Sequence, residues 1–177
     1  MNVDVGAVRR AKEGNIESFE MVYAQVAPDL YKVALYTLGN THDAEDAVSE
    51  TFLEAFKGIK NLRDETKFAS WIMKILSIRC KRKIGQYIKD KNSIDIDEIM
   101  GLTSTEGDPT QRAEVLTALN ELKQEERLIV VLSVLQGYTI REIAAILGCP
   151  QGTVSSKFHR TLKKLKEKLS KKTSLEF

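Results

Sequence analysis

The sequence has few of the residues on which metal sites and disulfides depend. Among 177 residues there are only two cysteines and two histidines. Cys80 and Cys149 lie far apart along the chain, and neither His42 nor His159 has a second ligand at metal-binding spacing. Structural metal sites and disulfides need clustered ligands or an oxidising compartment. We therefore predict no metal, no disulfide and no cofactor.

Proline and long apolar runs are also scarce. The three prolines, at 28, 109 and 150, leave room for long helices. No apolar run approaches the roughly 20 residues that span a bilayer. The segment from Met1 to Gly14 is charged and lacks the apolar core of a secretion signal. Hydrophobic residues make up 42% and charged residues 29%, an ordinary globular balance. We expect a cytoplasmic protein with no membrane insertion.

Charge is distributed unevenly along the chain, although the net charge is only +2. Residues 61–89 and 151–177 each carry a net charge of +6. Acidic stretches lie before and between these blocks, with −4 over residues 1–60 and −5 over residues 90–111. Charge alone fits two solvated helix faces as well as it fits contact with a polyanion at two separate places.

Helical spacing of apolar residues runs through most of the chain, and no strand-like alternation persists. We predict an all-α protein with two small helical domains, residues 1–89 and 109–177, joined by a flexible acidic linker over residues 90–108. The first helix is expected over Val5–Lys12. A second one follows Gly14 and Asn15, and Pro28 would kink it or split it.

Two further helices of the first domain are expected to present opposite charges. Thr41 can cap the first of them, which has an apolar stripe and, displaced around the axis, an acidic stripe offered outward: Asp43, Asp46, Glu50 and Glu54. The second helix, from Phe68 to about Lys89, has a basic second half containing Arg79, Lys81, Arg82 and Lys83. Its expected inward residues are Phe68, Trp71, Ile72, Ile75, Leu76 and Ile78.

The stretch from Thr139 to Leu165 has the pattern of a helix-turn-helix. Thr139 and Glu142 form a capping box, and Gly148, Cys149 and Pro150 turn the chain sharply. Val154, Phe158 and Leu162 provide the apolar side of the second helix. Its other side is left with Thr153, Ser155, Ser156, Lys157, His159 and Arg160. Short polar and cationic side chains near a helix N-terminus suit base edges and phosphates in a major groove.

Three segments together resemble the extracytoplasmic-function family of RNA polymerase sigma factors. The segment 43–56 resembles the family's core-binding helix, and 67–72 looks like the start of its DNA-melting and −10-reading helix. The segment 148–160 is similar to its −35-reading helix-turn-helix. All three occur in the family's order and spacing. The resemblance covers about residues 15–87 and 111–169, and it implies a sigma factor without catalytic residues that gives RNA polymerase its promoter choice.

The resemblance also implies roles for individual residues. Core polymerase, through its β′ coiled coil, would be bound by Asp43, Asp46, Ser49, Glu50 and Glu54. The −10 element would be met by Asn61, Arg63, Lys67, Arg79, Lys81, Arg82 and Lys83. The −35 element would be met by Thr153, Ser155, Ser156, Lys157, His159, Arg160 and Lys163. The β flap of the polymerase and an anti-sigma factor are further implied partners.

This sequence departs from the family pattern at three of its positions. The long helix of the family usually carries asparagine in place of Ile78 and aspartate in place of Arg82, and the recognition helix often has a basic residue in place of Ser155. Base preferences of the family therefore do not transfer directly to this chain.

Three other functions remain as alternatives. A two-component or quorum-type regulator has a similar helix-turn-helix, but a receiver domain would need strands that the first 90 residues do not show. A hydrolase would need a nucleophile, a histidine or a phosphate loop beside the carboxylates of residues 43–54. A protein that binds polymerase without reading DNA would have no use for Arg160 or the basic tail, residues 163–172.

Overall fold

The computed structural model describes residues 1–90 and 117–173, and within these ranges it contains helices and no strand. Side chains are described for residues 1–86 and 117–167. Apart from Asp90, the predicted linker lies outside the described residues, as do the first residues of the second predicted domain. The all-α fold class is confirmed.

Side-chain caps fix where the first helices begin. Helix α1, Val5–Lys12, begins after Asp4, whose carboxylate accepts hydrogen bonds from the backbone N–H groups of Gly6 and Ala7. Helix α2, Ile16–Leu38, begins in the same way after Asn15. Helix α3, Thr41–Gly58, is capped by Asn40, which accepts from the backbone N–H of Asp43 at 2.9 Å. The predicted cap at Thr41 was therefore wrong by one residue, because the capping hydrogen bond from the backbone N–H of Asp43 is accepted by the side chain of Asn40.

Pro28 does not divide α2. The helix continues through it to Leu38 and ends at Gly39, whose φ of 76° favours glycine. Pro28 is exposed, so the backbone carbonyl that loses its N–H donor there lies on the solvent side of the helix. The helix is therefore not split at Pro28, which was one of the two predicted alternatives.

Two short 3-10 helices, η1 at Ile59–Asn61 and η2 at Glu65–Lys67, lead into helix α4, Phe68–Asp90. The inward face of α4 contains Phe68, Ile72, Leu76, Cys80 and Ile84, all buried. Ile78 is 52% exposed, against the prediction that it is inward. Each residue turns a helix by about 100°, so Ile78 lies about 160° around the axis from Leu76.

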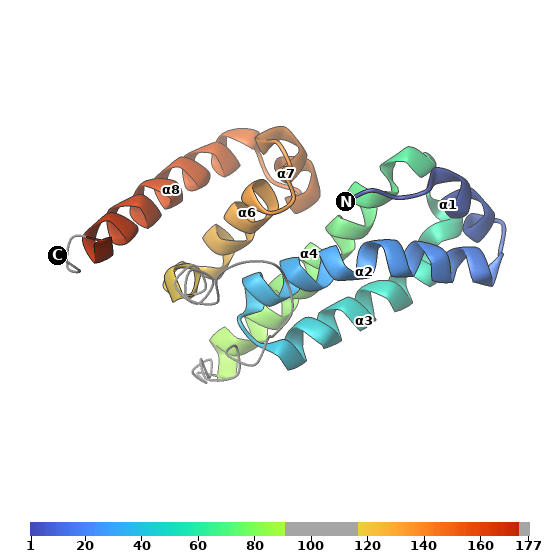
Figure 1. Ribbon diagram of the computed structural model, residues 1–177, viewed down its shortest axis with the longest axis horizontal. Helices are drawn as coiled ribbons and strands as arrows, with labels where there is room; N and C mark the ends of the chain where they lie inside the picture. Colours follow the sequence, from blue (N-terminus) through green and yellow to red (C-terminus); the bar gives the residue numbers. More distant parts are fainter. Residues whose placement is uncertain (91–116, 174–177) are drawn as a thin grey trace.

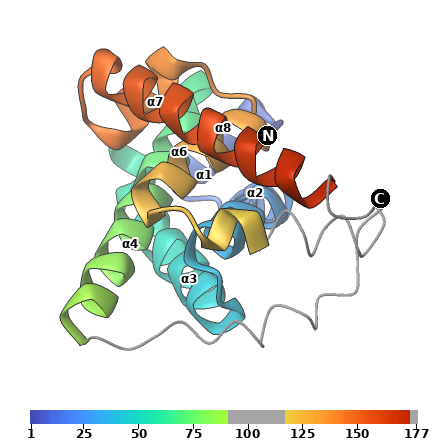
Figure 2. The ribbon, with the colours of Figure 1, turned by 90° about the vertical axis from the view of Figure 1, so that its left-hand side faces the viewer.

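The carboxy-terminal part contains helices α6, Gln124–Val134, α7, Ile140–Leu147, and α8, Gln151–Thr173. Helices α2, α3 and α4 lie side by side, and α6 and α7 lie over one side of them, as Figures 1 and 2 show. Helix α2 contacts α6, and α4 contacts α7. One continuous apolar core runs from Ala7 to Val154 through both parts. We call residues 1–90 the first module and residues 117–173 the second module.

Candidate nucleic-acid interface

The helix-turn-helix predicted from the sequence is present as α7 and α8. The hydroxyl of Thr139 accepts a hydrogen bond from the backbone N–H of Glu142, and the Glu142 carboxylate accepts one from the backbone N–H of Thr139 at 2.8 Å. That backbone hydrogen bond holds the pKa of Glu142 below its ordinary value. Helix α7 ends at Gly148 with a φ of 65°, and the turn through Cys149 and Pro150 leads directly into α8.

The recognition helix α8 has one buried side and one exposed side. Val154 and Thr161 are fully buried, and Phe158 packs partly into the core. The exposed residues are Thr153, Ser156, His159, Arg160 and Lys163, while Ser155 and Lys157 are partly buried. Most of the predicted −35 contacts therefore share a solvent-facing surface, where they could reach a DNA groove.

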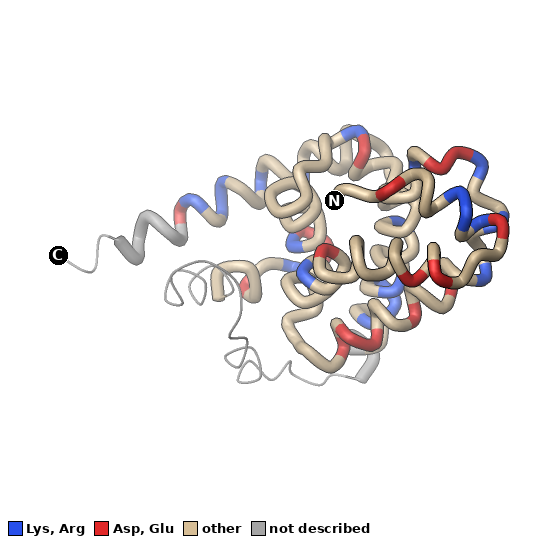
Figure 3. The backbone as a smooth tube through the Cα atoms, turned by 45° about the vertical axis from the view of Figure 1, so that its right-hand side comes forward, with Lys and Arg blue, Asp and Glu red and all other residues tan. Residues whose placement is uncertain are grey.

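The cations of α8 divide into two groups. Lys157 forms an ion pair with Glu125 of α6 at 2.5 Å, and the hydrogen bond from Lys157 lowers the pKa of Glu125. Lys164 pairs with the buried carboxylate of Glu126 at 3.2 Å. Arg160 and Lys163, by contrast, form no ion pair with any residue of the described part of the chain. Figure 3 shows the basic residues spaced along α8.

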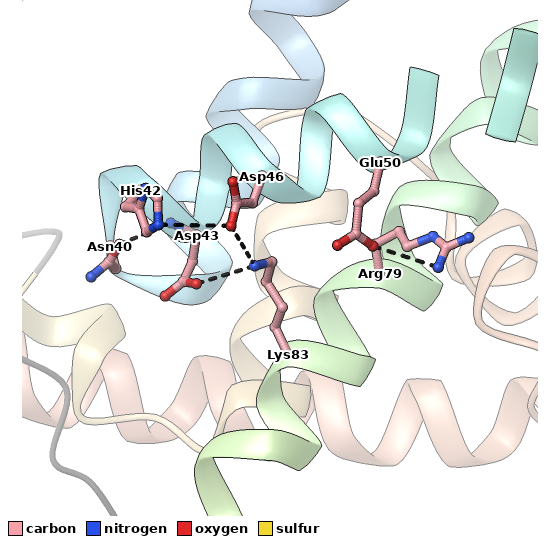
Figure 4. Close-up of polar contacts among 7 residues, drawn as sticks. All are labelled: Asn40, His42, Asp43, Asp46, Glu50, Arg79 and Lys83. Atoms are coloured by element: carbon pink, nitrogen blue, oxygen red, sulfur yellow. Dashed lines mark hydrogen bonds and ion pairs between the residues drawn. The ribbon is translucent and has the colours of Figure 1, made fainter. Parts of the chain in front are cut away.

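In the first module, the predicted acidic and basic stripes face each other. Lys83 of α4 lies 3.2 Å from carboxylate oxygens of both Asp43 and Asp46 on α3, as Figure 4 shows. Four residues earlier on α4, Arg79 pairs with Glu50 at 3.5 Å and also with Glu54. The pairing order runs in opposite directions along the two helices, so α3 and α4 are antiparallel. We call these six residues the acid–base seam.

The side chains of the seam are only partly buried, and both this burial and the ion pairs affect the pKa of Lys83. Burial, the largest single influence on the pKa of Lys83, acts to lower it, but the contacts with Asp46 and Asp43 together outweigh burial and raise it. The Lys83 side chain is 15% exposed, whereas the side chain of Asp46 is 48% exposed. Asp46, Glu50 and Glu54 thus each contact a cation of α4 through a carboxylate oxygen, while about half of each side chain is exposed to solvent. Asp43 is less exposed.

This pairing was not part of the sequence interpretation, which treated the two stripes as separate surfaces. A signal was present: the acidic residues repeat at three- and four-residue spacing, and the cations Arg79 and Lys83 are four apart on the next helix. Ser49 of α3 and Arg82 of α4 are exposed, as are Asn61, Arg63 and Lys67 around the 3-10 helices. The structure thus places Arg79 and Lys83 in the seam, apart from the exposed residues of the same predicted −10 group.

Lys81 and Arg127 make contacts that the sequence interpretation also missed. The Lys81 ammonium, from the predicted −10 group, donates to the backbone carbonyl of Leu147 at 3.1 Å. Arg127 of α6 is 2% exposed and donates to the carbonyls of Thr37 at 3.2 Å and Asn120 at 2.8 Å. Nothing in the spacing of charged residues distinguishes Arg127, because helix α6 is apolar on most sides.

Among the described residues, no group of three histidine, cysteine, aspartate or glutamate side chains is placed to hold a metal ion. None of the described helices is both long enough and apolar enough to cross a membrane. Burial raises the pKa of the Cys80 thiol to about 12, so it is unreactive at neutral pH.

The structure combines a helix-turn-helix, whose second helix has an exposed polar and basic side, with a second helical module that has paired acidic and basic stripes. A helix-turn-helix of this kind is typical of DNA-binding proteins. Comparisons with known proteins narrow this class. The family described as Sigma-70 region 2 matches residues 22–91, and the family described as Sigma-70, region 4 matches residues 112–165. The first match overlaps the first module over residues 22–90, and the second overlaps the second module over residues 117–165.

Relatives of known function agree with these matches. The chain is 32% identical over 167 residues to the ECF RNA polymerase sigma factor SigE of Mycolicibacterium smegmatis, covering 89% of this chain and 63% of that protein. It is 28% identical to the RNA polymerase sigma factor CarQ of Myxococcus xanthus, covering 92% and 95%. The solved structure of the sigma factor RpoE in complex with the anti-sigma factor NepR from Bartonella quintana is similar with a TM-score of 0.72 and 25% identity, covering 88% of this chain and 98% of that one. The chain belongs to the extracytoplasmic-function family of RNA polymerase sigma factors.

Proposed function

We propose that this sigma factor binds core RNA polymerase, recognises a −35 and a −10 promoter element, and starts transcription while the polymerase performs the chemistry. The observation that carries the proposal is the exposed side of α8, on which Thr153, Ser156, His159 and Arg160 face solvent above a buried apolar side. A helix presented in this way fits the major groove of B-DNA.

The −35 element would be read by the second module. Arg160 has no ion pair among the described residues and can donate two parallel hydrogen bonds to a guanine, a contact that discriminates by roughly 1–3 kcal/mol. Ser155, Ser156 and His159 offer shorter polar groups beside it. Lys157 and Lys163 would contact phosphates, although Lys157 must first exchange its ion pair with Glu125.

The −10 element would be met by the first module. Exposed Asn61, Arg63 and Lys67 lie in the segment that contains η1 and η2 and leads into α4, and this segment would hold a base taken out of the stack. Opening duplex DNA costs about 1.4 kcal/mol per stacked step, so phosphate contacts must help. These contacts would come from the basic half of α4, where Arg82 is exposed and the others are paired: Arg79, Lys81 and Lys83.

Core polymerase would bind the outer half of the acid–base seam together with Ser49. Each carboxylate of Asp46, Glu50 and Glu54 is about half exposed while it is also paired with α4, so it can meet a basic surface of a partner without leaving the seam. The β′ coiled coil is the expected partner here, and the β flap is the expected partner of the second module. An anti-sigma factor is a further expected partner, and the protein would act in the cytoplasm and would not be an enzyme.

Run-off transcription with purified core polymerase tests this function. Promoter fragments are first enriched by binding to the reconstituted holoenzyme and then used as templates. We expect a transcript from one start site that depends on adding the protein, with core polymerase alone as the control. Absence of any start-specific transcript on all enriched fragments would contradict the proposed function.

A further inference from the structure

One large apolar side chain in the middle of helix α4 faces solvent. Ile78 is 52% exposed, while other residues form the sides of α4 that meet the core, the seam and helix α7. Ile78 therefore lies on a further side of the helix that no described element covers. A single exposed isoleucine has no functional meaning by itself, but its neighbours on this side of the helix give it one.

Two cations flank Ile78 on the exposed side of α4. Residues four apart lie on the same side of a helix, so Lys74 lies one turn before Ile78 and Arg82 one turn after it, and both are exposed. Neither cation forms an ion pair with any residue that the structure describes. They are separated by about 12 Å along the helix axis, which corresponds to about three or four nucleotide steps of about 3.4 Å each. We call Lys74, Ile78 and Arg82 the α4 stripe.

The α4 stripe combines two phosphate-binding groups with an apolar group between them. Cations that hold phosphates of one DNA strand at this spacing would leave Ile78 facing the bases in between. The edges of adenine, guanine and cytosine carry hydrogen-bond donors and acceptors that isoleucine cannot satisfy, and covering such groups without a partner is unfavourable. Thymine differs because it has an apolar 5-methyl group on its edge. Covering this methyl group with Ile78 removes apolar surface from water, which favours thymine over the other bases.

We propose that Ile78 is a specificity-determining residue of the −10 contact and that it selects a thymine by covering the 5-methyl group of the base. This inference rests on the proposed function, which brings the basic half of α4 to the −10 element, and it adds the base that one position of that element holds. Lys74, which the sequence interpretation did not include among the −10 residues, would bind a phosphate together with Arg82. The expected discrimination is about fourfold, which corresponds to about 0.8 kcal/mol for one buried methyl-sized group.

Replacement of thymine by deoxyuridine tests this contact, because the two bases differ only in the 5-methyl group. Promoter fragments enriched with the reconstituted holoenzyme are prepared with a mismatched second strand at the −10 element, so that opening the duplex does not contribute to the measured affinity. Each thymine of the −10 element is then replaced in turn, and the affinity of the holoenzyme is measured by fluorescence anisotropy. We expect one position at which loss of the methyl group weakens binding about fourfold.

Variants at residue 78 assign this difference to the isoleucine. Holoenzyme with Ile78→Asn should bind the thymine and deoxyuridine promoters equally, whereas Ile78→Val, which keeps part of the apolar surface, should retain a difference of about twofold. The matched control is Ile16→Asn, the same substitution at an exposed isoleucine of α2, which should keep the full difference. Circular dichroism and affinity for core polymerase monitor folding. Ile78→Ala, a better helix former, takes the place of Ile78→Asn should the asparagine variant fold poorly.

The role of Ile78 would be overturned by enriched promoters without a thymine in the −10 element, or by thymines that can all be replaced by deoxyuridine without loss of affinity. A difference between the two bases that persists in Ile78→Asn would also overturn it. So would a loss of affinity in Ile78→Asn that is equal on both promoters, because the isoleucine would then act without regard to the methyl group.

Binding of the free full-length protein to single-stranded oligonucleotides of thymidine or deoxyuridine separates these results from failure of the proposed function. In that case no enriched promoter would give a start-specific transcript, while the unaltered protein would still bind the thymidine oligonucleotide more tightly and Ile78→Asn would not. Failure of the inference alone would give the opposite result: start-specific transcripts would appear, and no replacement of thymine would have an effect that depends on Ile78.

Discussion

The acid–base seam of the first module and the exposed side of α8 use similar cations in opposite ways. In the seam, Arg79 and Lys83 each contact two carboxylates, and both side chains are largely covered. On α8, Arg160 and Lys163 face solvent and have no carboxylate partner among the described residues. The first set stabilises the packing of two helices. The second set is free to meet a polyanion without losing an internal contact.

This difference predicts where sequence discrimination arises. A cation that must leave two carboxylates gains little by moving to a phosphate, because one ion pair replaces another. A free arginine that is already directed at solvent gains the full contact and releases a counterion from DNA. We therefore expect α8 to dominate promoter discrimination and the seam to contribute mainly to helix packing and partner binding.

The largest expected effect follows from removing Arg160. Arg160→Ala should reduce use of the cognate upstream element about 5- to 150-fold, which corresponds to the roughly 1–3 kcal/mol of a good bidentate base contact. Binding to core polymerase should not change. Promoter affinity of the holoenzyme and affinity for core polymerase are measured in parallel, and Lys32→Ala, an exposed cation on α2, is the matched control.

Equal losses of promoter use and polymerase affinity in Arg160→Ala would contradict the comparison. That result would mean that the exposed side of α8 does not act as a reading surface.

The sequence was sufficient for elements whose signals are local. Helix α1 was predicted with its observed bounds, and the capping box at Thr139 and the turn at Gly148 were predicted residue by residue, because caps and left-handed glycines act over three or four residues.

Contacts between distant segments could not be predicted in the same way. Joining Lys83 to Asp43 requires the relative height of α3 and α4, which is set by the apolar packing between them and not by the charges themselves. Arg127 depends on the second module lying against the end of α2, a contact across 90 positions of sequence. Ile78 was wrongly predicted to face inward together with Ile75 and Leu76, which are buried. A residue two positions after Leu76 lies nearly on the opposite side of the helix, so Ile78 faces solvent.

An intermediate effect is expected from neutralising two half-exposed carboxylates of the seam, Asp46 and Glu50. Asp46→Asn with Glu50→Gln should weaken binding to core polymerase about tenfold, since charged contacts at a partner surface are lost together with part of the order of the seam. The sequence preference of the holoenzyme should not change. The control, Glu20→Gln with Glu45→Gln, removes two exposed charges of α2 and α3 outside the seam. Unchanged polymerase affinity in the seam variant would show that these carboxylates serve only to pack α3 against α4.

The smallest expected effect is on stability and comes from removing Lys83, the seam cation that pairs with Asp43 and Asp46. Lys83→Met leaves Asp43 and Asp46 facing each other without their shared cation, and it should lower the free energy of unfolding by about 1 kcal/mol, between the values for exposed and buried pairs. For a chain of this size, the melting temperature should fall by about 2–4 °C. The control is Arg82→Met, the exposed neighbour on the same helix, which should change the melting temperature very little.

The pH dependence separates this electrostatic cause from a loss of packing. The pKa of Lys83 is raised in the folded protein, so its pairing stabilises the fold from near-neutral pH up to its ordinary value of 10.5 and loses that contribution as the pH rises beyond it. The difference in melting temperature between the wild-type protein and Lys83→Met should therefore be constant from pH 6 to about 10 and shrink above that. A difference that persists unchanged at higher pH would assign the effect to the buried methylene groups of Lys83, and the seam would then be a packing feature like the apolar core beside it.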